Sequence, residues 1–303
     1  MTQSAGNGRA WLPVVVLLFG ASLWGVVWWP LKYFRHQGLG DAELVLYAYG
    51  LVAVVTAPVL WRQRHQWRSQ WRLLVLLALL GGYANLAFVT ALSHGQVIRV
   101  MMLFYLAPVW GVLGARIFLG EPIGPTRAVA VALAVGGAAI MLAGPGALSG
   151  GISLMDVLAL TSGMAFATNN VTCRAAQEIS VMGKAAAVFA GCAVLAGVLV
   201  GVQGTAMPVM DAGSWVWLAL FALLWLLAAT FATQYGVTHM QAGRASVLLL
   251  TELLAAVATA MLAGGEVLSL KETLGGALIL TAAVLEARSP GAADPAAAIP
   301  AGR

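Results

Sequence analysis

Charged residues are scarce in this sequence. Its 303 residues include only 16 Lys and Arg and 11 Asp and Glu, or 9% of the chain, whereas water-soluble domains usually carry about a quarter. Such a chain cannot cover a folded surface with charge, which excludes an ordinary water-soluble globular protein. Apolar residues make up 61% of the chain and the mean hydropathy is +0.90, so a lipid bilayer is the solvent that suits this composition.

Residues for metal or phosphate chemistry are few as well. Cys173 and Cys192 lie in apolar segments, and we interpret them as small buried side chains rather than a disulfide or metal pair. The four His fall at loop edges without ligand spacing, so we expect no metal and no cofactor. A Gly-x-x-x-x-Gly-Lys-Ser/Thr loop is missing, which argues against ATP-driven pumping.

Long apolar runs fill the chain instead. A membrane-spanning helix needs about 20 apolar residues, and we predict an all-α membrane protein of ten such helices. The N-terminal tail (1–11) and the Ala-, Pro- and Gly-rich tail (288–303) lie outside them, and we expect the second tail to be disordered. The predicted spans are 12–34, 42–61, 73–93, 98–119, 127–144, 154–175, 183–203, 214–236, 244–264 and 272–287.

The distribution of Lys and Arg predicts the orientation. If the N-terminus is cytoplasmic, 12 of the 16 basic residues fall on the cytoplasmic side, led by the loop between Arg62 and Arg72. The net charge of +5 is then explained by membrane topology, and we expect no nucleic-acid partner. We predict a multi-pass protein of the inner (plasma) membrane with both termini in the cytoplasm, and a homodimer is compatible with the sequence.

The sequence contains an internal repeat, with one unit at 12–145 and the other at 154–287. A shift of 145 residues places Glu121 on Glu266 and Arg99 on Arg244, and a shift of 142 places Trp24 on Phe166. Because each unit has five spans, an odd number, the second must be inverted relative to the first. Inverted repeats are a common basis for alternating access in transporters.

The motifs resemble the drug/metabolite transporter superfamily, in its ten-helix EamA-type branch. The resemblance rests on Trp24-Gly25 with Pro30 and Lys32, the block from Leu106-Ala107-Pro108 to Gly120-Glu121, the Glu266 block and Gly275-Gly276. The sequence departs from the pattern at Leu253, where a second Pro is expected. The resemblance implies export or exchange of metabolites such as amino acids, through a cavity lined by helices 1, 3, 4, 6, 8 and 9.

Glu252 is the strongest candidate for a functional side chain. It lies about 12 Å deep in the ninth predicted span, judged from the rise of a helix, and an unpaired carboxylate there is costly. Three roles are open: a counter-charge for a substrate amine, a proton carrier, or a structural partner of an Arg. Burial disfavours the ionised carboxylate, which is compatible with proton coupling.

Other polar and aromatic side chains extend the candidate substrate site. Arg99 either attracts an anionic substrate group or pairs with Asp41 or Glu43 at the end of the second span. Glu121 and Glu266, each directly after a span, are interpreted as structural residues that accept N–H groups from the start of the next helix, and Pro30 and Pro108 as structural too. The candidate substrate-binding residues are Trp24, Trp28, Tyr83, Asn85, Arg99, Tyr105, Asn169, Asn170, Trp225 and Glu252.

We therefore predict a secondary transporter of small organic metabolites, with amino acids as the first choice of substrate, and no enzymatic activity. The alternative is a membrane-embedded enzyme that acts on a lipid or a small metabolite. Such an enzyme usually gathers several His, Asp or Glu at one depth, whereas this chain has one deep carboxylate. Rings of charge that would indicate a channel are not evident in the sequence.

Overall fold

A computed structural model describes residues 11–119, 123–142, 152–205, 208–240 and 242–288. These residues form ten helical rods, which confirms the predicted all-α membrane fold. Within this part of the chain, seven helical stretches have the length and apolarity of a membrane span, and Val247–Leu262 is a shorter one. The first half consists of α1 (Leu12–Gly25), α2 (Trp28–His36), α3 (Asp41–Leu44), a π-helical turn (Val45–Tyr49), α4 (Gly50–Arg62), α5 (Arg64–Arg68), α6 (Trp71–His94), α7 (Val97–Phe104), α8 (Ala107–Leu119) and α9 (Pro125–Leu142).

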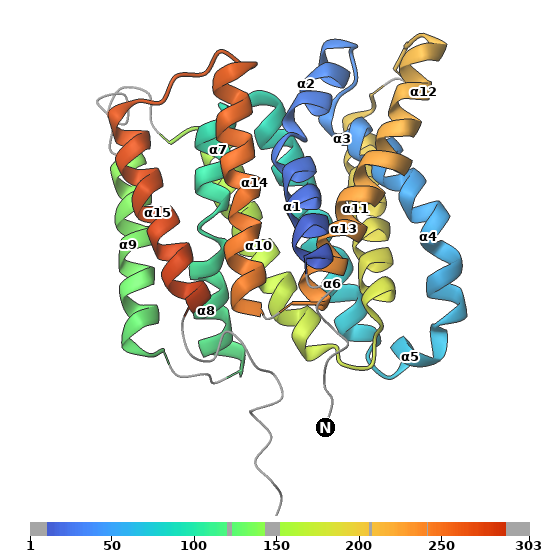
Figure 1. Cartoon of the computed structure of the whole chain (residues 1–303). Helices are drawn as coiled ribbons and strands as arrows, with labels where there is room; N and C mark the ends of the chain where they lie inside the picture. The colour runs from blue at the N-terminus through green and yellow to red at the C-terminus, as the bar shows by residue number, and fades with distance from the viewer. Residues whose placement is uncertain (1–10, 120–122, 143–151, 206–207, 241, 289–303) are drawn as a thin grey trace, which may run out of the picture.

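The second half repeats this organisation in the opposite direction. Figure 1 shows α1 and α2 running away from the end that carries α5, whereas α10 runs toward that end. We call the two ends of the bundle the α5 end and the α2 end. The elements are α10 (Leu154–Ala175), α11 (Val181–Gln203), α12 (Ala212–Leu220), a π-helical turn (Phe221–Leu226), α13 (Leu227–Thr238), α14 (Ala242–Leu262) and α15 (Leu270–Arg288).

Two rods of the first half are broken, and each break lies four residues before a proline. Pro30 has no N–H to donate to the carbonyl of Val26, and α1 ends at Gly25. Pro108 likewise leaves the carbonyl of Phe104 without its helical donor, and α7 ends at that residue. At the position of Leu253, which the repeat aligns with Pro108, α14 continues unbroken.

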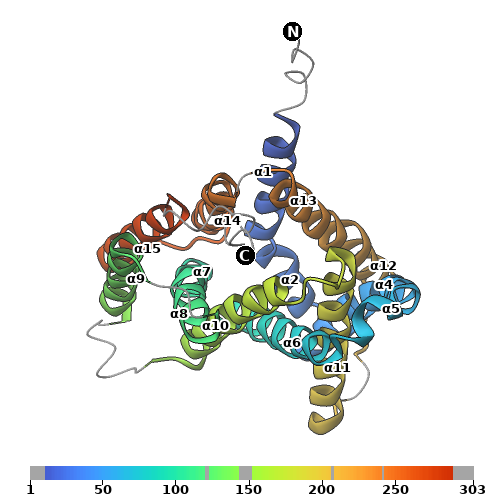
Figure 2. The same cartoon turned by 90° about the horizontal axis from the view of Figure 1, so that it is seen from below.

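Small residues allow the rods of the two halves to approach closely. Figure 2 shows α1 lying between α13 and α14. A Cβ atom added to Gly25 would lie 2.4 Å from the carbonyl oxygen of Glu252, and one added to Gly191 would lie 1.9 Å from that of Ala78. Close backbone contact of this kind is typical of helix association in membranes. It places α1 directly beside the segment of α14 that carries Glu252.

Candidate functional site

The break between α7 and α8 places Tyr105 where the two halves meet. Tyr105 lies between α7 and α8, at the turn that Pro108 causes. Its hydroxyl donates to the carbonyl oxygen of Leu249 on α14 over 3.1 Å, which places the phenol beside Glu252, three residues further along the same helix. One side chain from the first half thus bonds to the backbone of the second, next to its deep carboxyl group.

Glu252 lies at the middle of α14, on the eleventh of its 21 residues. The helical rise places it about 15 Å from the start of that helix. Its side chain is partly buried, and its backbone contacts Gly25 of α1. A carboxyl group at this depth, beside a phenol and a helix break, has the setting of a substrate or proton site in transporters with discontinuous helices.

A cluster of aromatic rings lies beside Tyr105. The ring of Phe104 lies 6.0 Å from that of Tyr105, 4.6 Å from that of Phe88 and 5.4 Å from that of Phe166. The sequence analysis did not single out Phe88 or Phe104 as site residues. Phe166 carried a signal, because the repeat aligns it with Trp24. These rings line one side of the candidate site with apolar faces.

The candidate tryptophans lie around α1. Trp24 is partly buried and packs against the main core, and the indole N–H of Trp225 donates to the carbonyl of Leu23 over 3.1 Å. Trp225 belongs to the π-helical turn before α13, an irregularity that is frequent at functional sites. Trp28 is buried, with 5% of its surface exposed, and its indole N–H donates to Thr259.

The candidates on α6 and α10 make separate local contacts. The hydroxyl of Tyr83 shares a 2.9 Å hydrogen bond with that of Thr161, and the amide of Asn85 donates to the carbonyl of Gly81 in its own helix. Asn169 is buried, and its side-chain oxygen has no partner among the described residues. Asn170 is exposed. We assign none of these four to the Tyr105–Glu252 pair.

Arg99 pairs with an acid that the sequence analysis did not propose. Its guanidinium donates to both carboxylate oxygens of Asp156, over 2.7 and 2.9 Å. Asp41 instead contacts His94, and Glu43 accepts the N–H of Gly40. Arg99 at the start of α7 is therefore joined to the start of α10.

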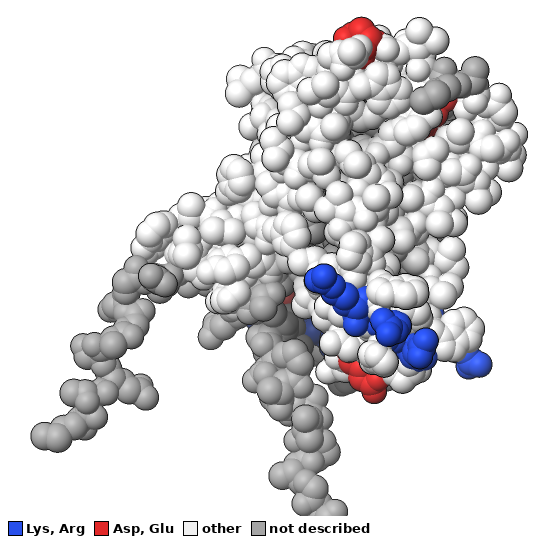
Figure 3. All heavy atoms as spheres, turned by 90° about the vertical axis from the view of Figure 1, so that its right-hand side faces the viewer, with Lys and Arg blue, Asp and Glu red and all other residues white. Residues whose placement is uncertain are grey.

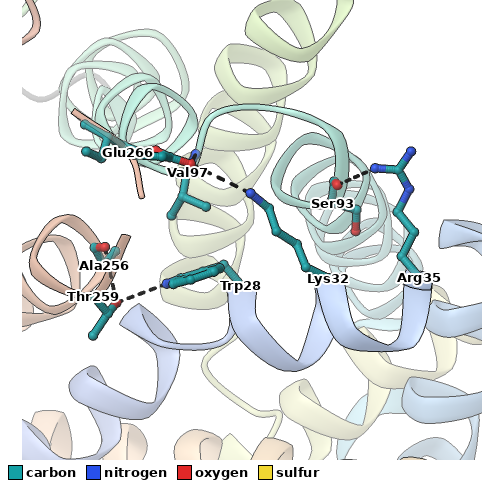
Figure 4. A network of polar contacts seen from close by, with 9 residues as sticks. Trp28, Lys32, Arg35, Ser93, Val97, Ala256, Thr259 and Glu266 are labelled. Atoms are coloured by element: carbon teal, nitrogen blue, oxygen red, sulfur yellow. Dashed lines mark hydrogen bonds and ion pairs between the residues drawn. The ribbon is translucent and has the colours of Figure 1, made fainter. Parts of the chain in front are cut away.

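A second polar cluster joins the two halves at the α2 end (Figure 4). The carboxylate of Glu266 accepts the N–H groups of Val97 and Ile98 over 2.7 and 3.0 Å, and the ammonium of Lys32 lies 3.7 Å from it. We expected Glu266 to accept from the helix that follows it, but it accepts from the start of α7, in the other half. Glu121 lies outside the described residues.

The chemistry available here is binding and proton exchange. In the described ranges, no three His, Cys, Asp or Glu side chains lie close enough together to hold a metal ion. A small, mainly apolar depression beside Tyr105 is lined by α8, α9 and α15. Small-molecule sites measure about 300–1,000 Å³, so this depression is too small to enclose an organic substrate in the present conformation.

Comparison with known proteins agrees with this arrangement. The sequence matches the model of the EamA-like transporter family twice, over residues 11–143 and 153–287. A riboflavin transporter from Rhizobium johnstonii (strain DSM 114642 / LMG 32736 / 3841) is 33% identical over 144 residues, which is 45% of this chain and 44% of the relative's length. A solved crystal structure superposes with a TM-score of 0.59 at 16% identity, over 90% of this chain and 95% of its own, and supports the fold alone.

Proposed function

The chain belongs to the EamA-like transporter family of the drug/metabolite transporter superfamily, and on that premise we propose that it is a secondary transporter working by alternating access. Family membership makes it a membrane transporter of small molecules. The enzyme alternative has no comparable support.

One observation carries the proposal: Tyr105 of the first half bonds to Leu249 of the second at mid-depth, which brings it beside Glu252 and the broken helices. Because the halves are inverted, a movement of one half against the other can expose this pair to either side in turn.

Glu252 is proposed to couple transport to a proton gradient or to hold a substrate amine. In this conformation the phenol of Tyr105 donates to the carbonyl of Leu249, and a switch of that hydrogen bond to an ionised Glu252 would accompany loss of the proton from the carboxyl group. A protonated Glu252 would cross the membrane interior as a neutral group, which lowers the cost of the conformational change.

The proposed substrates are small organic molecules with a planar or aromatic part. Amino acids remain the first choice, because a carboxyl group at Glu252 suits an amine and the rings of Phe104 and Phe166 suit an apolar side chain. The similarity to a riboflavin transporter favours a flavin-like ring system as the second candidate.

The test is gradient-driven flux of a panel of amino acids and riboflavin in proteoliposomes containing the full chain. We expect Glu252→Gln, which keeps the shape and hydrogen-bonding capacity of the side chain, to fold normally but to lose at least about tenfold in flux. Glu178→Gln is the matched control, since Glu178 is exposed at the α5 end. Wild-type flux for Glu252→Gln between about pH 6 and pH 8 would exclude Glu252 as the coupling residue.

We also propose that the α5 end faces the cytoplasm of a cell whose inner membrane holds the protein. The exposed arginines of the Arg62–Arg72 segment support this orientation. A cysteine introduced at Ser69, with Cys173 and Cys192 replaced by Ala, should resist an impermeant maleimide applied to intact cells and react once the cells are opened. Labelling in intact cells would reverse the orientation.

A further inference from the structure

The segment that joins α4 to α6 combines basic and aromatic side chains in a way that transport does not explain. Residues 61–72 contain four Arg and three Trp, with no Asp or Glu. Figure 3 shows Lys and Arg side chains gathered at this end of the molecule. We call this segment the Trp–Arg segment. Its arginines are Arg62, Arg64, Arg68 and Arg72, and its tryptophans are Trp61, Trp67 and Trp71.

The Trp–Arg segment is fixed to the bundle rather than loosely attached. The indole N–H of Trp67 donates to the carbonyl of Leu60 over 2.9 Å, and its ring packs against a cluster that includes Leu77 and Ile179. The side-chain oxygen of Gln63 accepts the hydroxyl of Ser180 at the start of α11. The segment therefore holds its remaining side chains in defined places.

The other two tryptophans are exposed, and an arginine guanidinium stacks on each ring. Trp61 is 73% exposed and Trp71 is 53% exposed. The guanidinium of Arg64 lies 5.4 Å from the ring centre of Trp61, and that of Arg72 lies 5.6 Å from the ring centre of Trp71. A guanidinium that contacts a ring through its face keeps its N–H groups at its edge, where they can bind phosphate oxygens in pairs.

The surroundings of these two stacks favour a lipid as the partner. Exposed indoles are typical of the headgroup level of a membrane. The lipid-facing surfaces of the adjoining helices continue with exposed apolar residues, Val54 and Val55 on α4 and Val75 and Leu76 on α6. Among the described residues, the four arginines form no ion pair; the nearby carboxylate of Glu178 accepts the hydroxyl of Ser69.

We propose that the Trp–Arg segment binds the phosphate of an anionic phospholipid through the stacked guanidinium groups of Arg64 and Arg72. The acyl chains would lie along the exposed apolar faces of α4 and α6. The net positive charge of the segment selects an anionic headgroup over a zwitterionic one, because each basic residue near an anionic surface changes affinity about fivefold. The bound lipid would fix the depth of this end in the bilayer.

The test is native mass spectrometry of the full chain in detergent, titrated with phosphatidylglycerol or phosphatidylcholine. The wild type should retain phosphatidylglycerol at lower concentrations than phosphatidylcholine. The double variant Arg64→Gln/Arg72→Gln should need about twentyfold more phosphatidylglycerol for the same occupancy. Arg116→Gln/Arg288→Gln is the matched control, since both residues are exposed arginines at the same end, and it should stay within twofold of the wild type.

Two further variants separate stacking from charge. Arg64→Lys/Arg72→Lys keeps the charge but loses the planar group, and should fall between the wild type and the Gln variant. Wild-type binding by this Lys variant, equal losses in the Arg116/Arg288 control, or complete displacement of the lipid by inorganic phosphate would each overturn the proposal. Lipid retention is measured without transport. The lipid proposal can therefore fail while the transport proposal stands, and the transport proposal can fail while the lipid proposal stands.

Discussion

Arg99 and Asp156 hold the starts of α7 and α10 together at the α2 end. The carboxylate side chain of Asp156 is only 3% exposed, whereas the Arg99 side chain is 28% exposed. Asp156→Asn should leave the guanidinium of Arg99 without a counter-charge and lower the free energy of unfolding by about 1–3 kcal/mol. This loss is smaller than that for breaking a fully buried ion pair, because Arg99 reaches solvent. The measurement is thermal or denaturant unfolding in detergent.

Asp211→Asn provides the control for that experiment. Asp211 accepts the N–H of Ser214 at the start of α12, as Asp156 accepts that of Ser153 beside α10, but it pairs with no arginine that the structure describes. Asn accepts the same helix-end hydrogen bond, so Asp211→Asn should leave the free energy of unfolding nearly unchanged. Equal effects of the two substitutions would show that the ion pair contributes no stability.

At the residue scale, depth in a span could be predicted, but partners could not. Glu252 stood out because a carboxyl group so far into an apolar run has few uses, and its position needs only a count of residues. The partner of Arg99 depends on how α7 and α10 are aligned, and no local pattern gives that alignment. For the same reason the sequence did not show that Asn169 is buried and Asn170 exposed.

At the element scale, Gly25 sets the spacing between α1 and α14. An added methyl group would meet the carbonyl oxygen of Glu252 at 2.4 Å and the Cβ of Ala255 at 2.8 Å. Gly25→Ala should therefore push the helices apart, lower the free energy of unfolding by about 1–3 kcal/mol, and reduce flux by moving Glu252. Unfolding in detergent and flux in proteoliposomes measure the two effects.

Gly111→Ala is the matched control, since an added Cβ at Gly111 on α8 has no atom within 4 Å among its neighbours. Alanine is the better helix former by about 1 kcal/mol, so this variant should be as stable as the wild type or more stable. If Gly25→Ala matched it in stability and flux, close approach of α1 to Glu252 would not matter.

The helix breaks illustrate what the sequence predicts about elements. Pro30 is interpreted from the sequence as a structural residue, and its missing N–H explains why α1 ends at Gly25, next to Val26. The unbroken course of α14 agrees with Leu253 in place of a second Pro. The π-helical turns Val45–Tyr49 and Phe221–Leu226 had no sequence signal, because they follow from packing between rods rather than from residue type.

At the scale of the whole molecule, the architecture followed from the repeat. Ten apolar runs and a 145-residue shift predicted two inverted five-helix units, and the family match and the helices confirm this fold. The sequence did not indicate which side chains join the two halves. Contacts such as the one that Glu266 makes with α7 depend on how the halves are placed against each other, and no local pattern gives that placement.

In the alternating-access cycle proposed above, the Glu266 cluster at the α2 end would have to open in each cycle. The carboxylate of Glu266 lies in the α14–α15 connection of the second half. It contacts Val97, Ile98 and Lys32 of the first half. Glu266→Gln removes the charge that attracts both the ammonium group and the start of α7. A loss of about 1–2 kcal/mol from one conformation shifts the ratio of open to closed molecules about tenfold.

A cysteine at Ala256 should detect that shift, because Ala256 is fully buried on α14, below the cluster. In a chain with Cys173 and Cys192 replaced by Ala, Glu266→Gln should raise the labelling rate of this cysteine by a water-soluble maleimide about tenfold. Glu272→Gln is the control, since Glu272 accepts only from Ser269 of its own helix start among the hydrogen bonds described here, and should leave the rate unchanged. Equal rates for the two variants would show that the charge of Glu266 does not hold the two halves together at the α2 end.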